Sequence, residues 1–195
     1  MVTTTMRAEC VGRKVRPLIL GISAGLFLAL APMPGCRAST AKGGAMNLSS
    51  TSFQGSRIPA KITCDGTGVS PQLAWSAAPA GAVSFALIVT DPDALVRTFV
   101  HWVLYDLPAG TRGLPEAVPA QGDLAGGGRQ GSNDFGNIGY GGPCPPSHSP
   151  HHYVFTLYAL DTKLDLPAGA TRAQVEAAMK GHILARGELV GLYNR

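Results

Sequence analysis

Histidine and aspartate side chains are the groups in this sequence best suited to anion binding or acid–base chemistry. Asp91 ends one apolar segment, His101 lies in the middle of a second, and His151 begins a third after a proline-rich loop. Such a set could form a two-histidine, one-carboxylate metal site, and His101 could activate a nucleophile such as Ser147. No motif places a nucleophile beside a base, which disfavours catalysis. From spacing alone, the three positions are also compatible with unrelated residues.

Two further motifs carry less chemistry than their residue types suggest. The glycine-rich segment 126–131 matches the GxGxxG pattern, but it follows no apolar strand and opens no helix, so the dinucleotide-binding interpretation fails. Cys64 and Cys144 lie in neither a CxxC nor a histidine-rich spacing, which disfavours metal ligation. We therefore expect no cofactor and no bound metal.

Three apolar segments must position the chemical groups. Each is rich in β-branched and aromatic residues and apolar on both faces, which predicts strands in the middle of packed sheets over residues 84–90, 99–107 and 153–160. In the second strand His101 shares a face with Phe99, Val103 and Tyr105, where a lone histidine is more often a packed core residue than a ligand. The Gly/Pro-rich stretch 122–150 cannot be regular for long, and loops of that length are uncommon unless functional.

One helix is predicted near the C-terminus. Thr171 begins it, and Gln174 follows three residues later, as in a capping box. Four residues then recur at helical spacing: Val175, Ala178, Met179 and His182. Gly181 or Gly187 marks the end of this helix, and residues 188–193 predict a short final strand.

The composition predicts a mainly β fold. The chain has 195 residues, of which 45% are hydrophobic and 14% charged, and it contains 25 glycines and 15 prolines. The charged fraction is well below the roughly 25% of ordinary soluble proteins. Apolar residues are too plentiful for a disordered chain, and the glycine and proline content indicates many turns, which excludes a helical bundle.

The positive net charge of +4 belongs to the N-terminus. Four basic residues lie between Arg7 and Arg16, whereas the chain from Arg37 onward carries 12 basic and 11 acidic residues. Binding to a phosphate backbone needs a clustered basic face, and this remainder has none, so no nucleic-acid partner is expected.

Residues 1–36 have the three parts of a secretory signal peptide. A basic region is followed by the 14-residue apolar run 18–31 and a Pro/Gly-rich exit. The run is shorter than the roughly 20 residues of a membrane-spanning helix. Gly35 and Cys36 favour cleavage and lipidation at Cys36 by the bacterial lipoprotein pathway, with conventional cleavage after Ala38 or Ala41 as the alternative.

We expect the exported chain to have two parts. Residues 37–45 are expected to form a flexible tether, and residues 46–195 a single domain. Cys64 and Cys144 are then an even pair in an oxidising compartment, which favours a disulfide between them. We expect a cell-envelope protein, anchored by lipid to a bacterial membrane or otherwise periplasmic or secreted.

Five motifs that occur in order resemble one protein family. The chain from Met46 to Arg195 is similar to the phosphatidylethanolamine-binding protein family, in particular its bacterial Raf-kinase-inhibitor-like branch. The five motifs together are far more specific than any one alone. They are Asp91-Pro92-Asp93-Ala94, Phe99-Val100-His101-Trp102, Asn133-Asp134-Phe135-Gly136, the segment Gly139 to Pro146, and Pro150-His151-His152-Tyr153.

The resemblance implies a β-sandwich with a large antiparallel sheet, a smaller second sheet and a few peripheral helices. It also implies that the loops carrying Cys64 and Cys144 lie near each other, and that a small anion pocket lies at one end. Leu95 stands where the family often has proline, and His152 where an arginine commonly precedes the tyrosine. Carried over position by position, the pocket comprises Asp91, His101, Tyr140, Pro145, Pro146, His151 and Tyr153.

The function that the resemblance implies is non-enzymatic binding of phosphate-like groups, such as a phospholipid headgroup. Two imidazoles and tyrosine hydroxyls can donate hydrogen bonds to an anion, and a carboxylate can orient one ring. The alternatives are a module that inhibits a partner enzyme of the kinase or protease type, and a hydrolase. The protein partner and a homodimer are left open.

Overall fold

The computed structural model describes residues 44–53, 57–146 and 149–195. The predicted signal peptide, Cys36 and Ser147 lie outside these residues. Among the described residues, no helix is long and apolar enough to cross a membrane.

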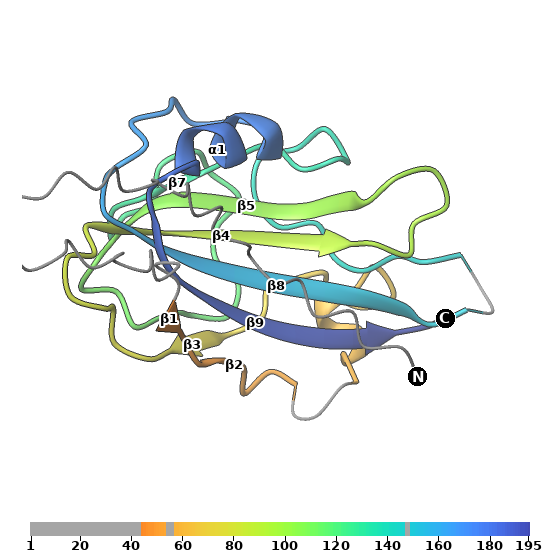
Figure 1. Ribbon diagram of the computed structural model, residues 1–195. Coiled ribbons are helices and arrows are strands. Elements are labelled where there is room, and N and C mark those ends of the chain that lie inside the picture. The colour runs from red at the N-terminus through yellow and green to blue at the C-terminus, as the bar shows by residue number, and fades with distance from the viewer. Residues whose placement is uncertain (1–43, 54–56, 147–148) are drawn as a thin grey trace, which may run out of the picture. The chain divides into compact units, whose positions relative to one another are not determined.

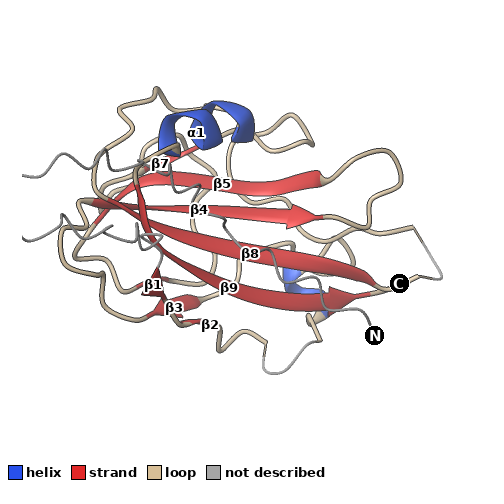
Figure 2. Ribbon diagram, in the orientation of Figure 1, coloured by secondary structure: helices blue, strands red, loops and turns tan. Residues whose placement is uncertain are grey.

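The described residues form two sheets and one α-helix (Figures 1 and 2). The six-stranded sheet has the order β1-β9-β8-β4-β5-β7, and the three-stranded sheet has the order β2-β3-β6. The large sheet is antiparallel except at one edge, where β1 runs parallel to β9. The strands are β1 (Gly44–Ala45), β2 (Leu48–Ser49), β3 (Leu73–Trp75), β4 (Ser84–Asp91), β5 (Phe99–Pro108), β6 (Gly113–Leu114), β7 (Arg129–Gln130), β8 (His151–Leu160) and β9 (Ile183–Tyr193); the helices are α1 (Arg172–Met179) and the short 3₁₀ helix η1 (Ala60–Ile62).

The three strands predicted from apolar segments are confirmed as the centre of the large sheet, where β8, β4 and β5 are neighbours. Alternate residues of a strand point to opposite faces. Phe85 and Leu87 of β4 accordingly join the core between the two sheets, whereas Ala86 and Ile88 join a second core on the other face of the sheet. That second core includes Val175 and Met179 of α1, so both faces of the large sheet are covered.

The predicted capping box begins α1. The Thr171 side chain accepts a hydrogen bond from the Gln174 N–H, and the Gln174 side chain accepts one from the Thr171 N–H at 2.9 Å. The helix ends at Met179, and Gly181, one of the two predicted ends, adopts a φ of +87° that a continuing helix does not allow. The ring of His182, which we expected on the helix, is instead hydrogen-bonded to Asp161 at 2.8 Å.

The final strand is longer than the sequence predicted. It covers Ile183–Tyr193, and Gly187 pairs with Leu157 in the middle of the sheet instead of ending the helix. A Cβ on Gly187 would lie 2.7 Å from the Met46 carbonyl oxygen, so glycine is needed where the N-terminal segment crosses the strand. Residues 44–45, which we expected at the end of the tether, form β1 against the same strand.

Candidate functional site

A cavity of about 390 Å³ lies at one end of the large sheet, where β4 ends and β5 and β8 begin. Six of the seven residues predicted for a pocket line it: Asp91, His101, Pro145, Pro146, His151 and Tyr153. Seven residues that the prediction did not include complete the lining: Ala94, Leu95, Val96, Arg97, Phe99, Phe135 and Cys144. The cavity therefore combines a few polar groups with mostly apolar walls.

Asp91 and His151 form a buried pair inside the cavity. Asp91 is the last residue of β4 and His151 the first of β8, and these strands are neighbours in the sheet. The two side chains are 6% exposed or less, and Nδ1 of His151 lies 2.7 Å from Oδ2 of Asp91. Because a carboxylate accepts, Nδ1 carries the donated proton, which leaves Nε2 as the ring nitrogen that can meet a ligand. The other carboxylate oxygen accepts the Asp93 N–H at 2.8 Å and fixes the turn.

His101 reaches the cavity through a β-bulge. Thr90 pairs with Val100 and Val89 with Trp102, so His101 is an extra residue without a partner on β4. A bulge of this kind redirects side chains relative to a regular strand. Val103 and Tyr105 lie in the core under α1, whereas the His101 ring packs edge to face on Tyr153 at 5.1 Å, between centroids. The expectation that His101 shares a face with Val103 and Tyr105 is therefore wrong.

The His101 ring is fixed by the loop that follows β7. Its Nδ1 lies 2.7 Å from the Gly141 carbonyl oxygen, which can only accept, so Nδ1 donates and Nε2 is left for a ligand. The rings of Phe99 and Phe135 lie 5.1 and 5.5 Å from the imidazole, between centroids. Burial lowers the pKa of His101 by more than the hydrogen bond to the Gly141 carbonyl raises it. The net pKa is therefore lowered, and the ring is neutral near pH 7.

Tyr153 brings a hydroxyl group that is not satisfied within the protein. The residue is 1% exposed, and its hydroxyl oxygen makes no hydrogen bond to any described residue. Burial raises the pKa of Tyr153, with a smaller contribution from the nearby Asp91 carboxylate, so the hydroxyl keeps its proton. Buried hydroxyls without partners are rare, and this one belongs to a residue that lines the cavity.

Tyr140 is the one predicted pocket residue that does not line the cavity. Its hydroxyl donates to the Ile62 carbonyl at 2.9 Å, and its ring packs edge to face on Trp102 at 5.4 Å, between centroids. Burial raises the pKa of this hydroxyl. The side chain therefore holds the loop after β7 against the η1 segment instead of contacting a ligand in the cavity.

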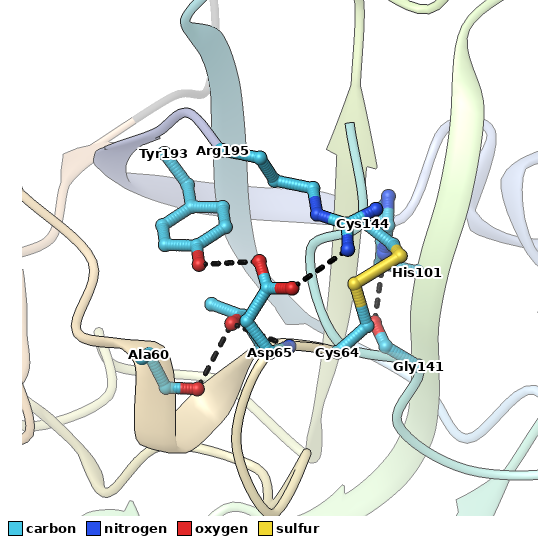
Figure 3. Close-up of a disulfide and its surroundings, with 9 residues drawn as sticks. Ala60, Cys64, Asp65, His101, Gly141, Cys144, Tyr193 and Arg195 are labelled. Atoms are coloured by element: carbon cyan, nitrogen blue, oxygen red, sulfur yellow. Dashed lines mark hydrogen bonds and ion pairs between the residues drawn. A yellow bond between two sulfur atoms is a disulfide. The ribbon is translucent and has the colours of Figure 1, made fainter. Parts of the chain in front are cut away.

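A disulfide joins Cys64 and Cys144, the two cysteines predicted to pair (Figure 3). Their Cα atoms are 5.4 Å apart. The Cys64 N–H also donates to the Pro143 carbonyl at 3.0 Å, so backbone and side chain both tie the loop to the turn after η1. Cys144 lines the cavity next to Pro145 and Pro146, which makes the disulfide part of the cavity wall.

Arg97 is the cation that sequence reasoning missed. It lies in the segment between β4 and β5, and its Nη1 donates to Oδ2 of Asp134 at 2.8 Å. His152 does not line the cavity, and its N–H and ring both bind the Asp93 carboxylate. The sequence offered one signal: Arg97, which is always positively charged, lies two residues before the strand that contains His101.

The structure does not favour the metal-site interpretation. Asp91 and His151 are hydrogen-bonded to each other, and His101 to Gly141. Within residues 44–53, 57–146 and 149–195 there is no group of three or more histidine, cysteine, aspartate or glutamate side chains that could hold a metal ion.

Comparison with known proteins gives consistent matches over the described domain. A family model described as phosphatidylethanolamine-binding protein matches residues 48–194. A protein of Methanothermobacter thermautotrophicus, named only as UPF0098 protein, is 50% identical over 151 residues, 77% of this chain and 99% of that protein. A protein of Mycobacterium tuberculosis named as a lipoprotein, LppC, is 41% identical over 140 residues, 71% of this chain and 67% of that protein.

Two solved structures resemble the fold closely. The phosphatidylethanolamine-binding protein homologue CT736 from Chlamydia trachomatis matches with a TM-score of 0.70 and 41% identity, over 78% of this chain and 99% of that one. YbcL of E. coli matches with a TM-score of 0.70 and 33% identity, over 77% and 98% of the two chains.

Proposed function

The chain belongs to the phosphatidylethanolamine-binding protein family, and from that premise we propose that it binds small anionic or phosphate-like groups in the cavity without catalysing a reaction. The proposed binding residues are His101, His151 and Tyr153, with Asp91 orienting one ring and Pro145 and Pro146 forming the wall. Tyr140 is not among them, because its hydroxyl is bound to Ile62.

The observation that carries the proposal is that Tyr153, whose buried hydroxyl has no partner, lines the same cavity as two oriented imidazoles. In both rings Nδ1 is already hydrogen-bonded, to Gly141 in one case and to Asp91 in the other. Two Nε2 atoms and one hydroxyl remain for a ligand. An anion with several oxygens would accept from the hydroxyl and from each imidazole that carries a proton on Nε2.

Calorimetric titration of sulfate and phosphoethanolamine into three proteins tests this proposal. His101→Asn keeps an amide donor near the position of Nδ1 for the Gly141 carbonyl but removes Nε2, so we expect at least tenfold weaker binding than in the wild type. His182→Asn is the matched control, because its ring pairs with Asp161 near the beginning of β9, at the other end of the sheet. Equal affinities in all three proteins would show that the cavity does not bind anions through His101.

We also propose that the protein is exported and lipidated at Cys36. The support is the basic segment, the apolar run and the Gly35–Cys36 junction, together with the relative from M. tuberculosis that is named as a lipoprotein. The intact mass of protein from membrane fractions should show loss of residues 1–35 and an acyl adduct, which Cys36→Ser should abolish. A mature N-terminus at Ser39 or Lys42 without lipid would contradict lipidation and leave export standing.

A second candidate function is inhibition of a partner enzyme by the rim of the cavity. Leu95 and Val96 are 88% and 94% exposed and Phe135 is 46% exposed, and all three surround the same opening. Exposed apolar groups gathered at one place often mark interaction sites. If a partner binds here, Leu95→Ser with Val96→Ser should abolish its inhibition, and the affinity for sulfate should stay unchanged.

A further inference from the structure

The cavity contains few charges that could balance a bound anion. Among the described residues that line it, Asp91 is the only acidic side chain and Arg97 is the only side chain that is always positive. Burial lowers the pKa of His101 and raises that of Tyr153, so both are neutral near pH 7. The His151 ring is paired with Asp91. A bound group with two negative charges therefore needs the positive charge of Arg97 to offset repulsion from the Asp91 carboxylate, which lines the same cavity.

Arg97 lies between the cavity and a neighbouring hollow of about 320 Å³ that contains Asp134. Its side chain is 63% exposed and is held by a single ion pair with Asp134. The same carboxylate oxygen accepts the Val100 N–H at 2.7 Å, so Asp134 keeps a backbone partner when the guanidinium leaves. Exposed ion pairs contribute little to stability, so the arginine can exchange partners at small cost.

We propose that Arg97 makes the cavity selective for dianionic groups, by exchanging the Asp134 carboxylate for the oxygens of a bound phosphate monoester. This proposal rests on the proposed anion-binding function of the cavity. The planar guanidinium binds two oxygens of a phosphate at once, and a monoester near pH 7 carries about −1.5 to −2 charges. A phosphodiester carries one charge less and loses less when Arg97 is removed.

Titrations with matched ligands test the selectivity. Phosphoethanolamine is a monoester, glycerophosphoethanolamine is the corresponding diester, and sulfate is a dianion without the ethanolamine group. Relative to the wild type, Arg97→Ala should bind phosphoethanolamine and sulfate at least tenfold more weakly and the diester less than threefold more weakly. The affinity of Arg97→Lys should be intermediate, because lysine keeps the positive charge but lacks the planar guanidinium that binds two oxygens at once. Arg186→Ala removes an exposed arginine paired with Glu188 on β9 and should change nothing.

Substitution of the competing carboxylate gives an independent measurement. Asp134→Asn keeps an oxygen for the Val100 N–H but releases Arg97, so we expect tighter binding of phosphoethanolamine. In the Arg97→Ala background the same substitution should have little effect, because no guanidinium remains to be released. An equal gain in both backgrounds would show that Asp134 acts only through long-range repulsion and would overturn the exchange.

The outcomes separate this proposal from the one on which it rests. If the wild type binds neither phosphate ligand nor sulfate, the proposed function of the cavity is wrong, and the role of Arg97 falls with it. If the wild type binds them and Arg97→Ala weakens all three equally or not at all, the cavity binds anions but Arg97 does not select dianions. Melting temperatures of all variants establish that affinity is compared between folded proteins.

Discussion

Gly141 is hydrogen-bonded to His101 through both of its backbone polar groups. Its N–H donates to the His101 carbonyl oxygen at 2.8 Å, and its carbonyl oxygen accepts from Nδ1 of the His101 ring at 2.7 Å. His101 has no partner on β4 because of the bulge, so the loop residue takes the place of a neighbouring strand. The loop thereby sets both the position of the strand and the tautomer of the ring.

Gly141→Ala should disturb the surroundings of His101 more than the fold. An added Cβ would lie 2.4 Å from the Phe135 ring, which must move. Because Phe135 is partly exposed, we expect a loss of only about 1 kcal/mol in the free energy of unfolding, at the low end for overpacking. Displacement of Phe135 exposes the imidazole to water, so the lowered pKa of His101 should rise toward its ordinary value, as measured by NMR titration.

Gly110→Ala is the control, because a Cβ at Gly110 would meet nothing within 4 Å. It should leave the pKa of His101 unchanged. If Gly141→Ala also leaves that pKa unchanged, then Phe135 does not contribute to the burial of the ring.

The central strands could be predicted from the sequence, whereas the bulge in β5 could not. Strands apolar on both faces must lie inside a layered fold, and the runs around Phe85, Trp102 and Phe155 showed this directly. The facing of His101 depends on one extra residue in the ladder, which is set by the pairing with β4 and by the Gly141 hydrogen bonds. Both contacts join residues that are distant in sequence, so the alternation of residue types within one strand cannot predict them.

The residues of the site also divide into those that the sequence predicted correctly and those that it did not. The motifs placed six of the seven predicted residues around the cavity, but Tyr140 lies outside it because its hydroxyl reaches the Ile62 carbonyl, far away in the chain. Arg97 was missed because its contribution depends on the cavity that the folded segment encloses. Gly187, which we predicted as a possible helix end, lies instead inside a strand. Glycine is needed there because a Cβ would come too close to the Met46 carbonyl oxygen.

The pH dependence of stability and that of anion binding should have opposite signs. Burial lowers the pKa of His101 in the folded protein, so below about pH 6.5 the unfolded chain binds a proton that the folded one does not. The free energy of unfolding should therefore fall between about pH 7 and pH 5. Affinity for sulfate should rise over the same range, because a bound anion favours the protonated imidazole.

Urea unfolding and sulfate titration at several pH values, in the wild type and in His101→Asn, measure both trends. The substitution should reduce both slopes. The Asp134 and Asp93 carboxylates, whose pKa values are lowered, affect stability only at more acidic pH, because they lose their contribution as pH falls through those lowered values. Affinity for sulfate that is flat from pH 7 to pH 5 would contradict a role for the His101 imidazole as a charged donor.

Removal of the disulfide should cost more stability than affinity. Cys64 and Cys144 are 80 residues apart, and the chain-entropy model assigns roughly 4.5 kcal/mol to closing a loop of that length. The Cys64 N–H to Pro143 bond and the Tyr140 hydroxyl bond to Ile62 remain when the sulfurs are removed. We therefore expect Cys64→Ala with Cys144→Ala to lower the free energy of unfolding by up to that amount, while affinity for sulfate falls less than threefold.

Denaturant unfolding and titration of the double variant and of the reduced wild type provide these values. Agreement between the two is expected, since both lack the same covalent bond. A loss of anion binding in a variant that remains folded would show that the disulfide, and not the hydrogen bonds, positions the cavity wall.

An anchor at Cys36 would attach the domain at the end remote from the cavity. The first described strand, β1, pairs with Ala185 and Arg186, whereas His151 of the cavity pairs with Tyr193 at the other end of β9 (Figure 1). Eight residue steps of β9 span about 26 Å at about 3.3 Å per residue. The eight steps from Cys36 to Gly44 reach at most about 29 Å when fully extended.

The cavity of an anchored molecule can therefore meet its own bilayer only with the tether stretched almost to its limit, which costs conformational entropy. We expect lipidated protein in phosphatidylethanolamine vesicles to bind added phosphoethanolamine as tightly as in phosphatidylcholine vesicles, because headgroups of the anchoring bilayer do not compete. Soluble glycerophosphoethanolamine should compete equally in both. Weaker apparent binding in the phosphatidylethanolamine vesicles alone would show that the cavity reaches its own membrane. Insertion of about 20 Gly/Ser residues before Gly44 should produce that weakening, because the longer tether lets the domain turn over.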